Sequence, residues 1–153
     1  MIPLSAVPGR LMEVGSGPDL LAWLAARGLD PDLVYFAAFC LASDLGATAA
    51  AAEPGLTASF VTGFCCGVCV HEEAPDRGAD PAASFAAALA AVNARGRHAV
   101  IADHCDLGAV ASIETSVAEA ICNDGPTDDD RRALVVRLFE LGLASGLAAT
   151  TRP

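Results

Sequence analysis

The chain has 153 residues, of which 54% are hydrophobic and 5% aromatic, and its formal net charge is −10. This length predicts one domain with enough core to fold without disulfides or metals. A chain this acidic repels phosphate backbones and anionic lipid surfaces, so we expect neither nucleic acid nor a membrane among its partners.

The composition predicts an all-α protein. Alanine dominates, aromatic residues are few, and the alternating pattern of strands is weak, which favours closely packed helices. We expect a compact single-domain bundle of roughly five to seven helices. Residues 1–17 are rich in proline and glycine and predict an irregular arm, so that the helical domain extends over residues 18–149.

The first two helices follow recognisable start and stop signals. A short helix over 18–27 begins with Pro18 and ends at Gly28. Asp30 then caps a helix whose first residue is proline. Asp44 falls on its apolar side and is a weak candidate for a catalytic acid, although its place near the helix end favours a solvated carboxylate. The inner face predicted for this second helix consists of Leu33, Phe36, Ala37, Cys40 and Leu41.

Residues 54–70 carry no charge and predict the helix around which the chain is organised. An apolar ridge repeats every fourth residue along it. The ridge consists of Leu56, Phe60, Phe64 and Val68. The uncharged segment is shorter than the roughly 20 residues of a typical membrane span, and glutamates rather than basic anchors flank it. We therefore expect a helix over 56–70 to be the most buried in a folded domain.

The second half of the chain predicts further helices. Asp80 and Pro81 open one that Gly96 closes, and residues 98–102 are expected to be helical although a short strand fits the same pattern. Asp106 is predicted to cap a helix through Cys122. The acidic run that precedes the last helix fits carboxylates in a first turn better than a metal site.

Two segments 53 residues apart share a polar pattern that indicates an internal duplication. Both patterns follow a helical period, so each forms one stripe along a helix. If the domain contains two related helical halves, the stripes face each other in the core. The pairs are Ser59 with Ser112, Thr62 with Thr115, Cys66 with Glu119, and Cys69 with Cys122.

The stripes predict a candidate metal site. Cys65, Cys66 and Cys69 lie within about one helical turn, and thiolates at this spacing share Zn²⁺ or Cu⁺. Cys66 and Cys69 together with Glu119 and Cys122 would form a four-coordinate set, with Cys65 or His71 as a substitute ligand. Buried cysteines also pack as small hydrophobic residues, and for any single cysteine that interpretation carries most of the weight. The first functional hypothesis is accordingly a soft-metal-binding or redox-responsive protein.

Two other functional classes stay open. One is a small helical enzyme with an apolar pocket, which would act on a hydrophobic metabolite with Asp44, His71, Asp103 or His104 as acid or base. The other is an oligomerising interaction module, because a mean hydropathy of +0.46 predicts a homodimer that covers apolar surface. The first residues lack the pattern of a secretory signal, so we expect a cytoplasmic protein with reduced cysteines.

Overall fold

The computed structural model describes Val7 and residues 17–44, 54–70, 81–122 and 129–150. Every regular element within these ranges is a helix, which confirms the all-α prediction. The predicted N-terminal arm falls almost entirely outside the described residues. The described helices are α2 (Gly17–Ala26), α3 (Pro31–Asp44), α4 (Pro54–Val70), α5 (Pro81–Arg95), α6 (Arg97–Ala102), α7 (Leu107–Cys122) and α8 (Asp129–Thr150).

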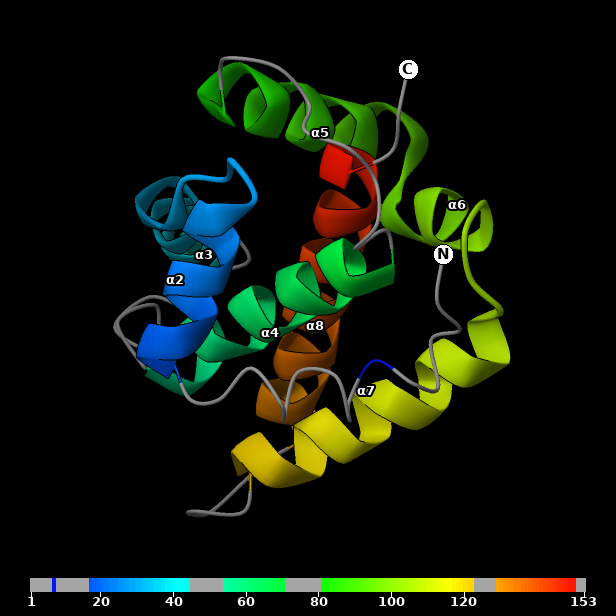
Figure 1. Ribbon diagram of the computed structural model, residues 1–153. Helices are drawn as coiled ribbons and strands as arrows, with labels where there is room; N and C mark the ends of the chain where they lie inside the picture. The colour runs from blue at the N-terminus through cyan, green and yellow to red at the C-terminus, as the bar shows by residue number, and fades with distance from the viewer. Residues whose placement is uncertain (1–6, 8–16, 45–53, 71–80, 123–128, 151–153) are drawn as a thin grey trace.

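The central element is α8, not the helix that the sequence analysis placed at the centre. In Figure 1, α8 passes through the middle of the molecule and α4 crosses it. The helices α3, α4, α5, α6 and α7 all contact α8. The expectation about burial does hold, because nearly every residue from Leu56 to Val70 is buried. The fold is thus a pair of apolar helices, α4 and α8, with the other helices packed around it.

Several helix ends follow the predicted caps. The Asp30 carboxylate accepts a hydrogen bond from the Asp32 amide at 2.9 Å, and the Asp106 carboxylate accepts one from the Ala109 amide at 3.2 Å. Gly28 and Gly96 have φ values of 75° and 87°, a left-handed conformation that glycine adopts without strain. Gly96 separates α5 from α6. The helical interpretation of residues 98–102 is therefore correct.

The closest helix contact in the described part of the chain is made by glycines. Gly63 and Gly67 on α4 lie against backbone atoms of α8, and Gly142 and Gly146 on α8 lie against backbone atoms of α4. A Cβ atom on Gly67 would be 2.6 Å from the Leu147 amide nitrogen. We call these four residues the glycine seam. Next to it the Ser59 hydroxyl donates a hydrogen bond of 2.6 Å to the Val135 carbonyl, which also joins the two helices.

Aromatic packing closes the core on one side of the seam. The Phe60 and Phe64 rings are stacked with their centroids 6.4 Å apart, and Phe85 of α5 meets Phe64 edge-on at 5.5 Å. All three side chains are buried.

The prediction for α3 was partly wrong, because Phe36 is 67% exposed while Val34, Ala37 and Ala38 are buried. An almost continuously apolar helix has no clear polar face, so its period alone did not identify the buried side.

The two helices that carry the proposed duplicated pattern occupy different environments. Ser59, Cys66 and Cys69 on α4 are buried, whereas Ser112, Thr115 and Glu119 on α7 are exposed. Figure 1 shows α4 in the interior and α7 along one edge of the molecule. The Thr115 hydroxyl donates to the Ala111 carbonyl of its own helix. The stripe on α7 therefore faces solvent, and it does not form a second half of the core.

By length and composition α8 is the described helix that could cross a membrane. Its apolar window is 67% buried within the fold. Core helices of folded domains meet the same criteria, so length and composition alone do not distinguish a core helix from a membrane-spanning one.

Candidate functional site

The three cysteines of α4 lie inside the protein. Cys65, Cys66 and Cys69 are each at most 2% exposed. Burial, followed by the neighbouring Cys69 thiol, raises the pKa of Cys65 to about 12, and the same causes raise the pKa of Cys66. Thiols are nucleophiles and metal ligands in their deprotonated form, so this environment opposes both roles. The geometry therefore favours packing as their present role.

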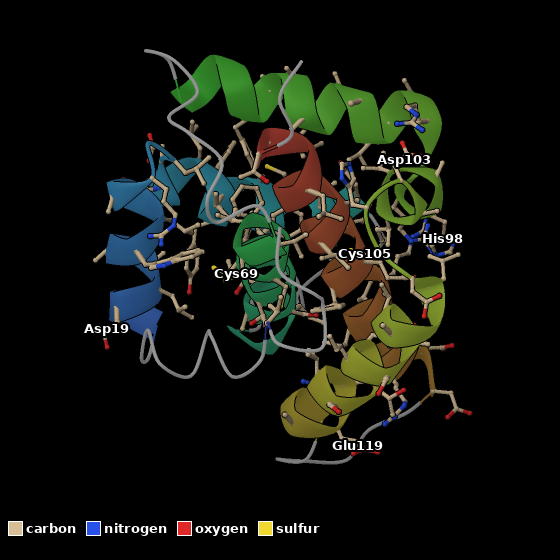
Figure 2. All side chains as sticks on the ribbon, turned by 45° about the vertical axis from the view of Figure 1, so that its right-hand side comes forward. Asp19, Cys69, His98, Asp103, Cys105 and Glu119 are labelled. Atoms are coloured by element: carbon tan, nitrogen blue, oxygen red, sulfur yellow. The ribbon has the colours of Figure 1, made fainter. Side chains whose placement is uncertain are left out.

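The predicted set of metal ligands is brought together only in part. Within the described residues no group of three or more His, Cys, Asp or Glu side chains is arranged to hold a metal ion. Glu119 is exposed, and in Figure 2 it lies toward the far end of α7, away from Cys69. The Cys122 side chain is outside the described residues. The Zn²⁺ or Cu⁺ site therefore stays a prediction, with Glu119 placed away from the other proposed ligands.

The four weak acid–base candidates are dispersed. Asp44 is exposed at the end of α3, as expected for a solvated carboxylate, and His71 lies outside the described residues. Asp103, directly after α6, forms an ion pair of 2.6 Å with Arg95 at the end of α5. Partial burial lowers the pKa of the adjacent His104, while the Asp103 charge opposes this shift. Figure 2 shows Asp103 at the edge of the molecule, where it joins α5 to α6.

The strongest polar cluster surrounds Glu140, a residue that the sequence analysis did not select. Glu140 is 8% exposed and lies midway along α8. Its Oε2 atom is 2.7 Å from Nε2 of His98, and its Oε1 accepts a hydrogen bond of 3.3 Å from Nε of Arg97. Both partners come from the short helix α6, which begins directly after Gly96. The two adjacent residues thus bind the two oxygens of one carboxylate.

A second carboxyl group reaches the same cluster from α7. Burial raises the pKa of Glu114, and the negative charge of Glu140 raises it further. Arg97, and His98 when it is protonated, act in the opposite direction, because a positive charge favours the ionised form of Glu114. The Oε2 atom of Glu114 is buried and has no hydrogen-bond partner among the described residues. Three helices, α6, α7 and α8, therefore meet at a mixed acid and base cluster.

An open groove of about 510 Å³ lies next to this cluster, on the outer face of α8. Arg97 of α6 forms one wall, and the other lining residues follow a helical period on α8, so they share one face. We call it the α8 groove. Its α8 residues are Asp129, Arg132, Ala133, Val136, Arg137 and Glu140.

The α8 groove concentrates positive charge on an acidic chain. Three of the nine basic residues line it, although the formal net charge is −10. Arg97 is paired with Glu140, whereas Arg132 and Arg137 have no carboxylate partner within the described part of the chain. Ala133 and Val136 contribute an apolar strip between these charges. The groove thus offers free guanidinium groups beside a small apolar surface.

The sequence contained part of the signal for this site. Arg132, Val136 and Glu140 are spaced four residues apart, so the sequence places them on one side of the last helix. A polar side opposite a core is usually solvated, so the pattern alone did not distinguish a groove from an ordinary surface. The contacts of Glu140 with α6 and α7 depend on packing between helices that are distant in sequence.

Comparisons of the chain with protein-family models, curated proteins and solved structures gave no match. Any functional conclusion therefore depends on the site itself.

Proposed function

We propose that this protein binds a small anionic molecule in the α8 groove. The observation that carries this proposal is the presence of Arg132 and Arg137 without carboxylate partners in the described structure, on a chain whose formal net charge is −10. Guanidinium groups form strong, charge-assisted hydrogen bonds with carboxylate and phosphate oxygens. Such a ligand would supply the partner that Arg132 and Arg137 lack.

The apolar strip narrows the class of ligand. Ala133 and Val136 lie on the same face as the two arginines, so an anion that carries a short hydrocarbon part would contact both. Asp129 and Glu140 at the groove disfavour highly charged polyanions, because their own charges repel them. The favoured ligand is a small carboxylate or phosphate with an apolar portion. Such a ligand is as small as the metabolite in the enzyme hypothesis. It differs from the hydrophobic metabolite of that hypothesis because it carries a negative charge.

The test is a titration of ¹⁵N-labelled protein with sulfate, inorganic phosphate, acetate and butyrate, followed by NMR. Arg137→Gln is expected to weaken binding about 10- to 100-fold, because a hydrogen bond to a charged group contributes roughly 1.5–3 kcal/mol. Butyrate should bind more tightly than acetate if the apolar strip contributes. The matched control is Arg95→Gln, since Arg95 pairs with Asp103 and does not line the groove.

Either of two results would overturn the proposal. One is the absence of shift changes around α8 with all four anions at millimolar concentrations. The other is binding that Arg137→Gln and Arg132→Gln leave unchanged, since the anion would then occupy another surface.

A second proposal concerns self-association. Tyr35, Phe36 and Phe39 of α3 are between 46% and 67% exposed, and they lie within about one turn of each other. Large exposed aromatic groups are unusual unless another surface covers them. This face is the described surface that best fits the expected homodimer. Light scattering should show a dimer that Phe36→Ser weakens at least severalfold, and a wild-type monomer at high concentration would contradict the proposal.

A further inference from the structure

Arg97 differs from the other two arginines of the α8 groove in how its guanidinium group is held. Its Nε atom donates a hydrogen bond of 3.3 Å to Oε1 of Glu140, and the other oxygen of Glu140 lies 2.7 Å from Nε2 of His98. The terminal nitrogens of Arg97 make no hydrogen bond or ion pair with the described part of the chain. One edge of the guanidinium group is therefore anchored, while its terminal nitrogens remain available to another partner.

The terminal nitrogens of Arg97 are also accessible from the groove. Arg97 lines the groove, and its side chain is 26% exposed, whereas that of Glu140 is 11% exposed. Among the described residues, the buried side-chain nitrogen and oxygen atoms that lack a partner belong to Arg27 and Glu114, and none belongs to Arg97. A molecule in the groove can therefore reach the Arg97 terminal nitrogens while the bond from Nε to Glu140 stays intact.

We propose that Arg97 selects the head group of the bound anion, and that it favours a carboxylate or phosphate over an anion with a single point of contact. The inference rests on the proposed anion site. The two terminal nitrogens of a guanidinium group carry parallel N–H groups that match two oxygens bound to one carbon or phosphorus atom. Arg132 and Arg137 attract any anion through their charge. Arg97 adds a requirement for two oxygens at a fixed spacing.

The contact with Glu140 makes the contribution of Arg97 geometric more than electrostatic. The negative charge of Glu140 offsets much of the Arg97 charge, so Arg97 adds little to the general attraction of anions. The same contact restricts the guanidinium group, because Glu140 is itself held by His98. A side chain that is already restricted loses less rotamer freedom when a ligand binds. Glu140 is therefore a positioning residue, which acts on the ligand through Arg97.

The experiment compares acetate with chloride, because each carries one negative charge and only acetate presents two oxygens. NMR titrations of ¹⁵N-labelled protein at matched ionic strength give the ratio of the two affinities. Arg97→Lys keeps the positive charge but replaces the planar fork with a compact ammonium group. We expect acetate affinity to fall about tenfold and chloride affinity to change little. The matched control is Arg95→Lys, since Arg95 pairs with Asp103 and does not line the groove.

A second pair of variants tests the positioning role of Glu140. Glu140→Ala removes a negative charge, which should strengthen the binding of both anions, but it also releases Nε of Arg97. The acetate-to-chloride ratio should therefore fall severalfold. Glu140→Gln removes the same charge and keeps an oxygen that accepts a hydrogen bond from Nε, so it should restore the ratio. If these variants do not fold, the wild-type protein still provides a test, because acetate and not chloride should shift the Nη signals of Arg97.

The possible outcomes separate this inference from the proposed function. An acetate-to-chloride ratio that Arg97→Lys leaves unchanged would overturn selection by Arg97 and leave the anion site of Arg132 and Arg137 intact. Arg97 would then be only an ion-pair partner of Glu140. A ratio that Glu140→Ala leaves unchanged would overturn the positioning role. Absence of acetate binding would overturn the inference, and the proposed function fails with it only if sulfate, phosphate and butyrate also do not bind.

Discussion

Replacing Gly142 with alanine is expected to lower the free energy of unfolding by about 3 kcal/mol, the upper end of the usual range for an overpacked core. The added Cβ atom would meet the Phe60 carbonyl and the Phe64 amide of α4, which are backbone atoms that cannot move out of the way by changing rotamer. The two helices would have to separate, and the packing of the whole seam would loosen. Urea denaturation followed by circular dichroism measures the change.

The matched control is Gly108→Ala on α7. A Cβ atom there would meet no backbone atom, only the Asp106 side chain, whose Oδ2 lies at 3.1 Å and needs to move by a few tenths of an ångström. Alanine is the better helix former by about 0.5–1 kcal/mol, so this variant should be neutral or slightly more stable than the wild type. If both substitutions changed stability equally, the close contact between α4 and α8 would not be a determinant of the fold.

Replacing Phe64 with alanine should cost about 3–5 kcal/mol of stability. Phe64 is fully buried, and its ring lies between Phe60 of the same helix and Phe85 of α5. Its removal leaves a cavity and ends two aromatic contacts. Because small domains are stable by only about 5–15 kcal/mol, the variant should unfold at a much lower urea concentration.

Phe36→Ala is the control for this result, because it deletes the same side chain from a position that is 67% exposed. We expect a change within about 0.5 kcal/mol, measured at a protein concentration low enough to exclude association. A loss in Phe36→Ala comparable to that in Phe64→Ala would show that α3 is covered in solution.

The helices and their caps could be predicted from sequence because their signals are local. Asp30 and Asp106 accept hydrogen bonds from backbone amides that lie two or three residues away, and Gly28 and Gly96 end helices through their own backbone conformation. The burial of residues 56–70 also followed from composition, since uncharged apolar residues cover every side of that helix.

The centre of the fold and the polar site could not be predicted in the same way. The structure places Gly142 and Gly146 in the closest contact of the last helix. A glycine contributes no hydropathy, so patterns of hydrophobicity do not detect a contact between backbones. From sequence alone Glu140 looks like a surface residue, because the helices that cover it, α6 and α7, are distant in the chain. The polar spacing shared by α4 and α7 did not correspond to equivalent environments, since one stripe is buried and the other is exposed.

The glycine seam also affects how the α8 groove would bind a ligand. Gly142 follows Glu140 by two residues, which turns it about 200° around α8, so the seam and the groove lie on opposite sides of one helix. Backbone contacts with α4 hold α8 on the side opposite the groove. Arg97 and His98 of α6 hold the Glu140 side chain. A bound anion would therefore meet a backbone that is already ordered. Little backbone conformational entropy would be lost on binding, so the cost of ordering falls mainly on the arginine side chains.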